Sequence, residues 1–232
     1  MHGYIDSIET MGLVDGPGIR MVVFLKGCKL RCLYCHNPET WDRVHAKIMT
    51  SNEIVEKAKN NMSYYKNGGI TFSGGEPLMQ PDFLIECLRN CHDLGIHTAL
   101  DTAGHGIGKY DEILDYTDLV ILDIKDITDD GAKYITGQNL DEFNKFIEVV
   151  KRKNKPLWIR QVVVPGINDN IEYMKSLKEY LKQFNTIEKI ELLPYHLYGI
   201  EKYKKLNIPY QLEGVEPLTD EDMTPFMEIL KD

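Results

Sequence analysis

The chain has 232 residues, of which 43% are hydrophobic and 27% charged, a balance typical of a globular domain that can bury a sizeable core. Its 27 Lys and Arg against 36 Asp and Glu give a net charge of −9, which argues against nucleic acid or an anionic membrane surface as the main partner. No apolar run is long enough to cross a membrane, and residues 1–6 do not resemble a secretory signal, so we expect a cytoplasmic protein. Three of the 5 cysteines lie close together, which indicates metal or redox chemistry rather than disulfides.

Short β-branched runs alternate with amphipathic helical stretches along the chain. The sequence predicts strands at 21–26, 70–73, 98–101, 119–124, 157–164 and 187–193. It predicts helices at about 50–65, 81–94, 140–153, 171–184 and 219–230. Thr50 and Glu53 form a capping box at the start of the first helix, and Gly95 ends the second. Pro225 falls inside the last helix unless that helix begins there.

This alternation is typical of parallel strands joined by right-handed crossovers, which build a doubly wound sheet or an α/β barrel. Six strand–helix units are too few for a closed eight-stranded barrel. We therefore predict an α/β fold, a partial and open (β/α)6 barrel, in a single domain over residues 1–232. Its core spans about 15–200 and a C-terminal extension about 201–232. Polar segments end or follow most of the strands, and in such folds they face one cavity.

The most specific motif is a C-x3-C-x2-C run, formed by Cys28, Cys32 and Cys35. Thiolates are soft ligands that suit iron–sulfur clusters or zinc. In a four-iron cluster, three cysteines leave one iron open to another molecule. A structural zinc needs four protein ligands, and His36 lies directly beside Cys35 rather than at a usual finger spacing. The spacing therefore favours a cluster, with zinc as the alternative.

Two further kinds of segment stand at the predicted strand ends. Ser73–Glu76 follows the second strand; its paired glycines permit close approach to a ligand and its carboxylate can receive an ammonium group. The alternative is a plain strand–helix turn with a surface glutamate. Asp101, Asp123 and Lys125 lie at the ends of the next two strands. Charges there are costly unless paired, so a purely structural ion pair is an equally good interpretation.

Together these motifs resemble the radical S-adenosylmethionine (SAM) enzymes, whose cysteine run has an aromatic residue, here Tyr34, before its last cysteine. Within that family the chain resembles the activases of glycyl-radical enzymes, in the branch that acts on pyruvate formate-lyase. Many other activases carry an inserted ferredoxin-like cysteine cluster, whereas no cysteine occurs here between Cys35 and Gly69. The matching segments, in family order, are Asp15–Arg20, His36–Trp41, Thr71–Pro77, Asp101–Gly104, Leu122–Lys125, Trp158–Arg160 and Leu193–His196.

The resemblance implies a [4Fe–4S] cluster on the three cysteines, with SAM on the fourth iron, and a 5′-deoxyadenosyl radical that takes a hydrogen from a glycine of the lyase. Asp15 and Gly16 would contact the substrate peptide, and a flavodoxin or ferredoxin would supply the electron. A monovalent cation, Na⁺ or K⁺, would be held by Asp101, Thr102, Asp123 and the Ile121 carbonyl. The residues implied to bind SAM are Tyr34, Cys35, His36, Gly74, Gly75, Glu76, Asp123, Ile124, Lys125, Arg160 and His196.

Other functions compete with this interpretation. One is a radical SAM enzyme acting on another glycyl-radical protein or on a small molecule, as a deazapurine-forming synthase does; the Asp15–Arg20 loop argues against the small molecule. Another is a non-catalytic iron–sulfur or zinc module, which would leave the Gly-Gly-Glu segment and the strand-end charges unexplained. Cys87 and Cys91 lie one helical turn apart on an apolar face, so we expect them to pack in the core.

Overall fold

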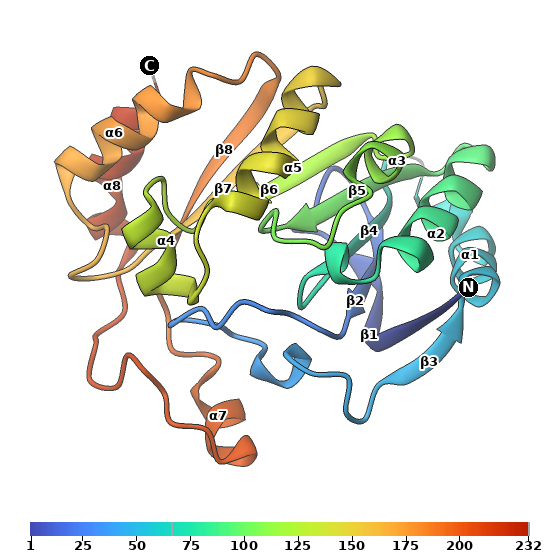
Figure 1. Ribbon diagram of the computed structural model, residues 1–232, viewed down its shortest axis with the longest axis horizontal. Helices are drawn as coiled ribbons and strands as arrows, with labels where there is room; N and C mark the ends of the chain where they lie inside the picture. The colour runs from blue at the N-terminus through green and yellow to red at the C-terminus, as the bar shows by residue number, and fades with distance from the viewer. Residues whose placement is uncertain (66, 232) are drawn as a thin grey trace.

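A computed structural model describes residues 1–65 and 67–231 and builds them around one mostly parallel sheet (Figure 1). The strands are β1 (His2–Gly12), β2 (Arg20–Leu25), β3 (Lys47–Thr50), β4 (Gly69–Gly74), β5 (His97–Thr102), β6 (Leu119–Asp123), β7 (Leu157–Val163) and β8 (Ile187–Pro194). Their order in the sheet is β3-β1-β2-β4-β5-β6-β7-β8. β2 and β4–β8 run parallel, and β1 and β3 add antiparallel at one side. The sheet does not close, because β3 and β8 are both edges. The predicted open barrel is confirmed.

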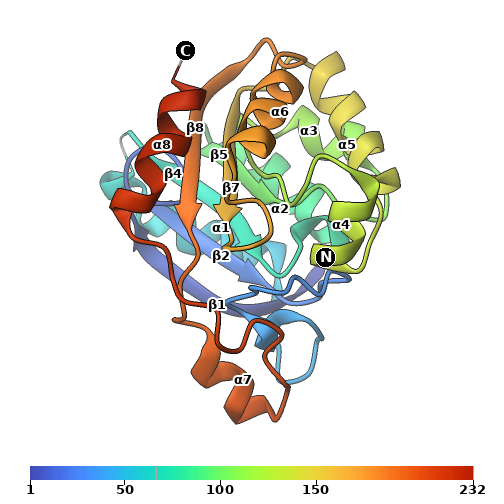
Figure 2. The same cartoon turned by 90° about the vertical axis from the view of Figure 1, so that its left-hand side faces the viewer.

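Helices cover the outer face of the curved sheet, while α7 projects from the rest near the C-terminal end of the chain (Figure 2). Short 3₁₀ turns lie at Pro38–Thr40, Met62–Tyr64 and Pro77–Met79. None of the described helices is long and apolar enough to span a bilayer. The helices are α1 (Ser51–Asn60), α2 (Pro81–Asp93), α3 (Tyr110–Asp115), α4 (Asp129–Thr136), α5 (Asp141–Arg152), α6 (Ile171–Leu181), α7 (Ile200–Leu206) and α8 (Asp220–Leu230).

The helix ends follow from local chemistry. At the start of α1 the Thr50 hydroxyl accepts from the Glu53 N–H at 3.2 Å and the Glu53 carboxylate accepts from the Thr50 N–H at 2.7 Å, which confirms the capping box. α1 ends at Asn60, before the predicted residue 65. Gly95, at φ +71°, follows the end of α2 as predicted. α8 begins at a second capping box, and Pro225 lies inside the helix rather than at its start.

Five elements were not predicted: β1, β3, α3, α4 and α7. The sheet therefore begins at His2, ahead of the predicted core. Of the 11 residues of β1, 3 are buried and the rest are exposed or half-buried, so its sequence lacks the continuous apolar run that marks the buried parallel strands. α4 contains Gly131, whose added Cβ would lie 2.2 Å from the Asp126 carboxylate. That close approach requires glycine at position 131. Because glycine is unfavourable inside a helix, its presence makes α4 hard to predict from the sequence.

Candidate active site

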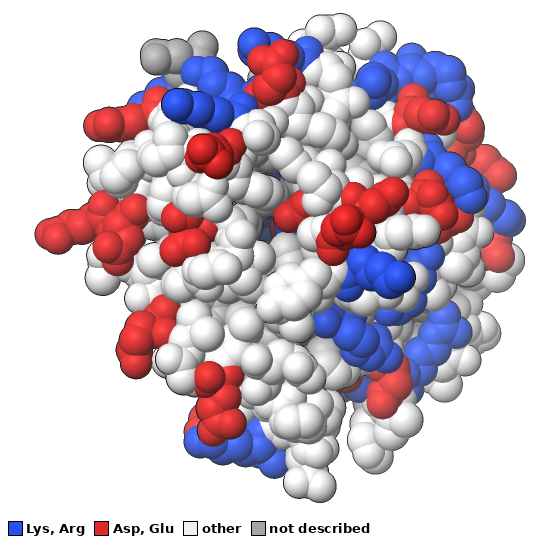
Figure 3. All heavy atoms as spheres, turned by 60° about the vertical axis from the view of Figure 1, so that its left-hand side comes forward, with Lys and Arg blue, Asp and Glu red and all other residues white. Residues whose placement is uncertain are grey.

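A cavity of about 250 Å³ lies at the carboxyl ends of the parallel strands. Figure 3 shows a face of the molecule that is hollowed near its middle and carries both acidic and basic side chains around the hollow. The predicted residues that line the cavity are Cys28, Cys32, Tyr34, Cys35, His36, Gly74, Gly75, Asp101, Thr102, Asp123, Lys125 and His196. Glu76, Ile121, Ile124, Arg160, Asp15 and Gly16 are absent from its lining among the described residues.

The cysteine loop follows β2 and is fixed by backbone hydrogen bonds to distant segments. The Cys28 N–H donates to the Trp41 carbonyl at 3.0 Å, and the Leu33 N–H donates to the Ile135 carbonyl at 3.0 Å. Arg31 stacks over the Trp41 ring at 4.7 Å and its Nη1 donates to the Cys28 carbonyl at 2.7 Å. These bonds hold the loop in place, and its three cysteines line one cavity.

The three thiols fit an iron–sulfur cluster. Burial raises the pKa of Cys28, of Cys32 to about 12, and of Cys35, while the nearby Lys125 ammonium partly offsets this for Cys32. Among the described residues, no three His, Cys, Asp or Glu side chains are grouped for a single metal ion. In a four-iron cluster each thiolate binds a different iron, so the sulfurs need a shared cavity rather than a shared ion. Binding the cluster would displace the thiol protons.

Gly74 and Gly75 form a wall of the cavity from bare backbone. Gly74 has φ +116°, and an added Cβ there would lie 2.2 Å from the Leu25 nitrogen. At Gly75 an added Cβ would lie 2.8 Å from the Gly27 carbonyl oxygen, and the Gly75 N–H donates to the Leu25 carbonyl at 2.8 Å. Glycine is required here because β4 passes so close to β2 and the cysteine loop.

Glu76 is fully buried beneath this wall. Its carboxylate accepts from the Thr102 hydroxyl at 2.6 Å, the Ala103 N–H at 2.9 Å and the Leu78 N–H at 3.1 Å. The side chain thus joins the end of β4 to the end of β5, and it does not line the cavity. Sequence reasoning placed the residue at the correct strand end, but its direction depends on these partners from other segments.

Asp123 and Lys125 form an ion pair at 2.5 Å inside the cavity. Burial alone would lower the pKa of Lys125, but Asp123 and the Tyr34 hydroxyl raise it above its ordinary value. Asp123 Oδ1 and the Tyr34 hydroxyl are both buried with no hydrogen-bond partner among the described residues. Unpaired buried polar atoms are costly, so this part of the cavity is suited to a polar ligand.

The four candidate cation ligands come from two neighbouring strands. The Ser73 hydroxyl donates to Asp101 Oδ2 at 2.6 Å, and burial raises the pKa of Asp101 to about 6. Ile121 lies opposite Asp101 in the β5–β6 ladder, but its side chain is in the core. The Thr102 hydroxyl already donates to Glu76.

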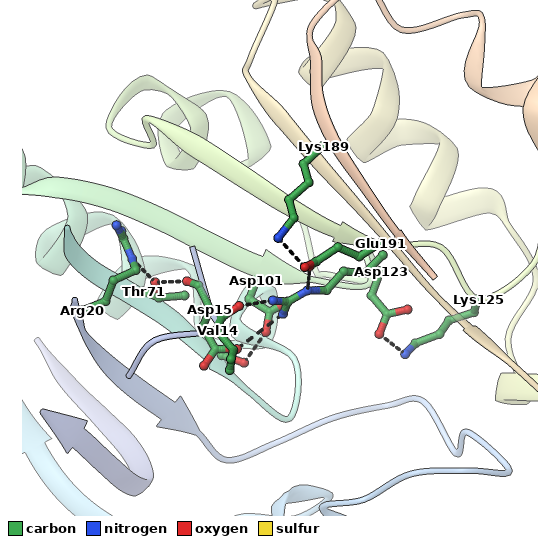
Figure 4. A network of polar contacts seen from close by, with 11 residues as sticks. Val14, Asp15, Arg20, Thr71, Asp101, Asp123, Lys125, Lys189 and Glu191 are labelled. Carbon is green, nitrogen blue, oxygen red and sulfur yellow. Dashed lines mark hydrogen bonds and ion pairs between the residues drawn. The ribbon is translucent and has the colours of Figure 1, made fainter. Parts of the chain in front are cut away.

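The sequence predicts Arg160 in the adenosyl pocket. In the structure its guanidinium bonds to Glu191, Asp15 and Val14, three residues that Figure 4 labels. Its Nε donates to Glu191 Oε2 at 2.9 Å, its Nη1 to Asp15 Oδ1 at 3.4 Å, and its Nη2 to the Val14 carbonyl. Glu191 also pairs with Lys189. Arg160 therefore joins the loop before β2 to the last strand, across the barrel. Sequence reasoning missed Glu191, although it pairs with Arg160 in the β7–β8 register.

The loop carrying Asp15 and Gly16 is folded around Arg20, which is fully buried. The guanidinium donates to the Thr71 hydroxyl at 2.6 Å and to the Ile70 carbonyl at 2.7 Å. The Thr71 hydroxyl in turn donates to the Asp15 carbonyl at 2.7 Å. Burial lowers the pKa of Arg20 to about 10, so the side chain stays charged near neutral pH. These bonds fix the loop from inside the barrel.

His36 and His196, which both line the cavity, stack with their ring centroids 3.9 Å apart. Burial and the neighbouring His196 lower the pKa of His36 to about 4, which favours two neutral rings. Behind them, α7 packs against the segment after the cysteine run: the Lys202 ammonium donates to Asn37 Oδ1 at 2.7 Å and to Glu39 Oε1 at 2.5 Å. The C-terminal part of the chain thus supports the cysteine loop.

Comparison with known proteins places this architecture in a family. The profile of the Radical SAM superfamily matches residues 22–177. The chain is 50% identical to a pyruvate formate-lyase-activating enzyme of Clostridium pasteurianum over 99% of this chain and 98% of that protein. It belongs to the pyruvate formate-lyase-activating enzymes. A second member of that family, from Staphylococcus epidermidis, is 42% identical over 95% of this chain and 92% of that protein.

Solved structures agree with this family. A domain of a pyruvate formate-lyase-activating enzyme from Bacteroides vulgatus superposes with a TM-score of 0.58 at 28% identity, covering 71% of this chain and 94% of that one. A radical SAM methyltransferase from Sphaerobacter thermophilus shares the fold, with a TM-score of 0.64 at 16% identity over 91% of this chain and 63% of that one. As a radical SAM enzyme the chain uses a [4Fe–4S] cluster and SAM.

Proposed function

We propose that this enzyme activates pyruvate formate-lyase by generating a radical on one of its glycines. When bound, the [4Fe–4S] cluster and SAM supply a 5′-deoxyadenosyl radical that abstracts the glycine hydrogen. One observation carries the proposal: Cys28, Cys32 and Cys35 line the same cavity as the bare backbone of Gly74 and Gly75. No acid–base pair is needed, so the protein's task is to orient the reactants and exclude water.

The residues of the chain take different parts in this task. Cys28, Cys32 and Cys35 would hold the cluster. The residues assigned to direct contact with SAM are Tyr34, His36, Gly74, Gly75, Asp123, Lys125 and His196, which all line the cavity. Glu76, Ile124 and Arg160 would act indirectly: the first fixes Thr102 and Ala103, and the Ile124 N–H donates to the Arg160 carbonyl at 2.8 Å.

We also propose a monovalent cation at Asp101, Thr102, Asp123 and the Ile121 carbonyl, since hard oxygen donors suit such an ion. Exchanging NaCl or KCl for tetramethylammonium chloride at constant ionic strength should then weaken SAM binding about tenfold, a loss of ~1.4 kcal/mol. Equilibrium binding of SAM to the cluster-loaded enzyme measures this. Equal affinity in all three salts would remove the cation from the proposal.

The remaining assignments concern the domain, the cellular location and the partners of the enzyme. We propose that residues 1–232 act as one radical SAM domain in the cytoplasm, with neither a membrane nor nucleic acid as a partner. A flavodoxin or ferredoxin would supply the electron, because the radical chemistry consumes one electron in each cycle. The net charge of −9 disfavours polyanionic partners.

Electron paramagnetic resonance tests the main proposal. Anaerobic mixtures of the reduced, cluster-loaded enzyme with SAM and pyruvate formate-lyase should give a carbon-centred glycyl doublet, formed in proportion to 5′-deoxyadenosine. An alanine version of the lyase's glycine should leave no such radical, because the target hydrogen is lost. Deoxyadenosine made at full rate with no radical on the lyase, and a small molecule consumed instead, would contradict the proposal.

Changing Asp15 tests the peptide contact separately. Asp15→Ala should raise the KM for a lyase peptide about tenfold or more, the effect of losing ~1.4 kcal/mol of binding. The cluster absorbance and SAM affinity should stay unchanged, because Asp15 does not line the cavity. Asp93→Ala, at the exposed end of α2, is the matched control. An unchanged KM in the Asp15 variant would exclude a contact between this carboxylate and the peptide.

A further inference from the structure

The last strand of the sheet has an open side. Among the described strands, β8 pairs with β7 alone and ends the strand order. None of the 8 residues of β8 is buried, whereas most of β7 is. The exposed side chains include Glu188, Lys189 and Leu193. An edge strand left accessible in this way presents backbone groups that another chain can pair with.

The ladder identifies the groups at this edge. The Tyr195 N–H donates to the Val163 carbonyl at 3.0 Å, and Ile190 and Leu192 are the register partners of Ile159 and Gln161. In a parallel ladder alternate residues bond to the neighbouring strand. The N–H and C=O groups of Ile190 and Leu192 therefore point away from β7. Among the residues that the structure describes, no other segment bonds to them.

A groove of about 530 Å³ runs along this edge. It is lined by each residue of Ile187–Leu193 and, on α8 and just after it, by Met227, Leu230 and Lys231. Successive side chains of a strand point to opposite faces, so a groove that contacts all of them follows the edge rather than one face. Leu193 also lines the cofactor cavity. The groove and the cavity therefore meet at the carboxyl end of β8.

We propose that the free edge of β8 binds the lyase segment next to the target glycine as an added β-strand. The inference rests on the proposed function and names how the peptide is held. The glycine must come within about 3–4 Å of the reacting carbon in the cavity, which requires an extended backbone at its mouth. With a rise of about 3.3 Å per residue, residues two and four positions from the glycine reach Leu192 and Ile190. Main-chain hydrogen bonds give such strand addition its affinity.

Backbone methylation of the peptide tests this pairing on the unchanged enzyme. The probe is a fluorescent peptide of the lyase's glycine segment, methylated at one backbone nitrogen at a time and bound to the cluster-loaded enzyme with SAM under anaerobic conditions. Alternate positions on one side of the glycine should each lose about tenfold or more in affinity, and the positions between them little. A flat profile, or losses without alternation, would overturn the inference.

A matched pair of variants tests the strand itself. Leu192→Pro removes the N–H at the free edge, which the ladder to β7 does not use, and Leu192→Ala shortens the same side chain but keeps that N–H. Peptide affinity should fall about tenfold further in the proline variant than in the alanine variant, with cluster absorbance and SAM binding equal in both. Equal peptide affinities would contradict the pairing.

Hydrogen exchange in the unchanged enzyme tests the same pairing without relying on the proline variant, which could fail to fold. In the unchanged enzyme, the amides of Ile190 and Leu192 should exchange more slowly when the unmethylated peptide is bound. Unslowed exchange, or a dimer that pairs through β8 without peptide, would overturn the inference. If a glycyl radical forms but the Ile190 and Leu192 amides are not protected, this inference alone is contradicted. If no radical forms on the lyase, the proposed function is contradicted.

Discussion

Cys32→Ala is expected to abolish cluster assembly and with it all formation of deoxyadenosine. The thiol is one of three that line the cavity, and losing it leaves two irons of a four-iron cluster without a protein ligand. The chain should still fold, because Cys32 sits in a small apolar cluster with Leu30 and Ala103, apart from the main core. Anaerobic reconstitution followed by the cluster's visible absorbance and by iron and sulfide analysis measures the loss. Cys28→Ala and Cys35→Ala should behave alike.

Cys91→Ala is the matched control, since Cys91 is also buried but lies in the main core on α2. It should keep the full cluster absorbance and lose only packing, on the order of 1–2 kcal/mol of unfolding free energy. Cys87→Ala should do the same. A Cys87 or Cys91 variant that keeps its fold but loses the absorbance would contradict the assignment of the ligands.

Gly74→Ala should destabilise the fold by about 3–5 kcal/mol, from strain at a positive φ together with overpacking. The added Cβ would lie 2.2 Å from the Leu25 nitrogen and 2.4 Å from its carbonyl oxygen. Both are ladder backbone atoms, so relief requires β2 and β4 to separate. That separation would also displace the cysteine loop that follows β2. Anaerobic urea unfolding and SAM binding are the two measurements.

Gly95→Ala separates strain from crowding. Gly95 also has a positive φ, +71°, but an added Cβ would meet no atom of the described residues within 4 Å. This variant should lose only about 1–2 kcal/mol, the cost of a left-handed conformation with a side chain, and should bind SAM normally. If the two variants lost equal stability, the close approach of β4 to β2 would not be the reason for glycine at 74.

The inner parallel strands, β2 and β4–β7, were predictable because they are mostly buried and so read as short apolar runs. β6, with Leu119–Leu122 buried, is the clearest case. The cysteine run and the strand-end charges were predictable because parallel strands bring their carboxyl ends to one edge. The structure then places most of those side chains around one cavity.

The direction of individual side chains was not predictable, because it depends on partners far along the chain. Glu76 turns toward Thr102 and Ala103, and Arg160 toward Asp15, which is 145 residues away. β1 was missed for a different reason. Few of its residues are buried and it pairs antiparallel, so it carries neither the long apolar run of a buried strand nor a clean two-residue alternation.

The contact between Lys202 and Asn37, 165 residues apart, bears on when the enzyme can take up iron. Bringing two such distant residues together adds little to the entropic cost of folding, because the entropy lost on closing a loop grows only with the logarithm of its length. Such a long separation does slow folding, since the two residues must meet before their contact can stabilise the chain. During synthesis, α7 leaves the ribosome after most of the barrel. The cysteine loop gains this support only then, so iron loading belongs after translation of the C-terminal part.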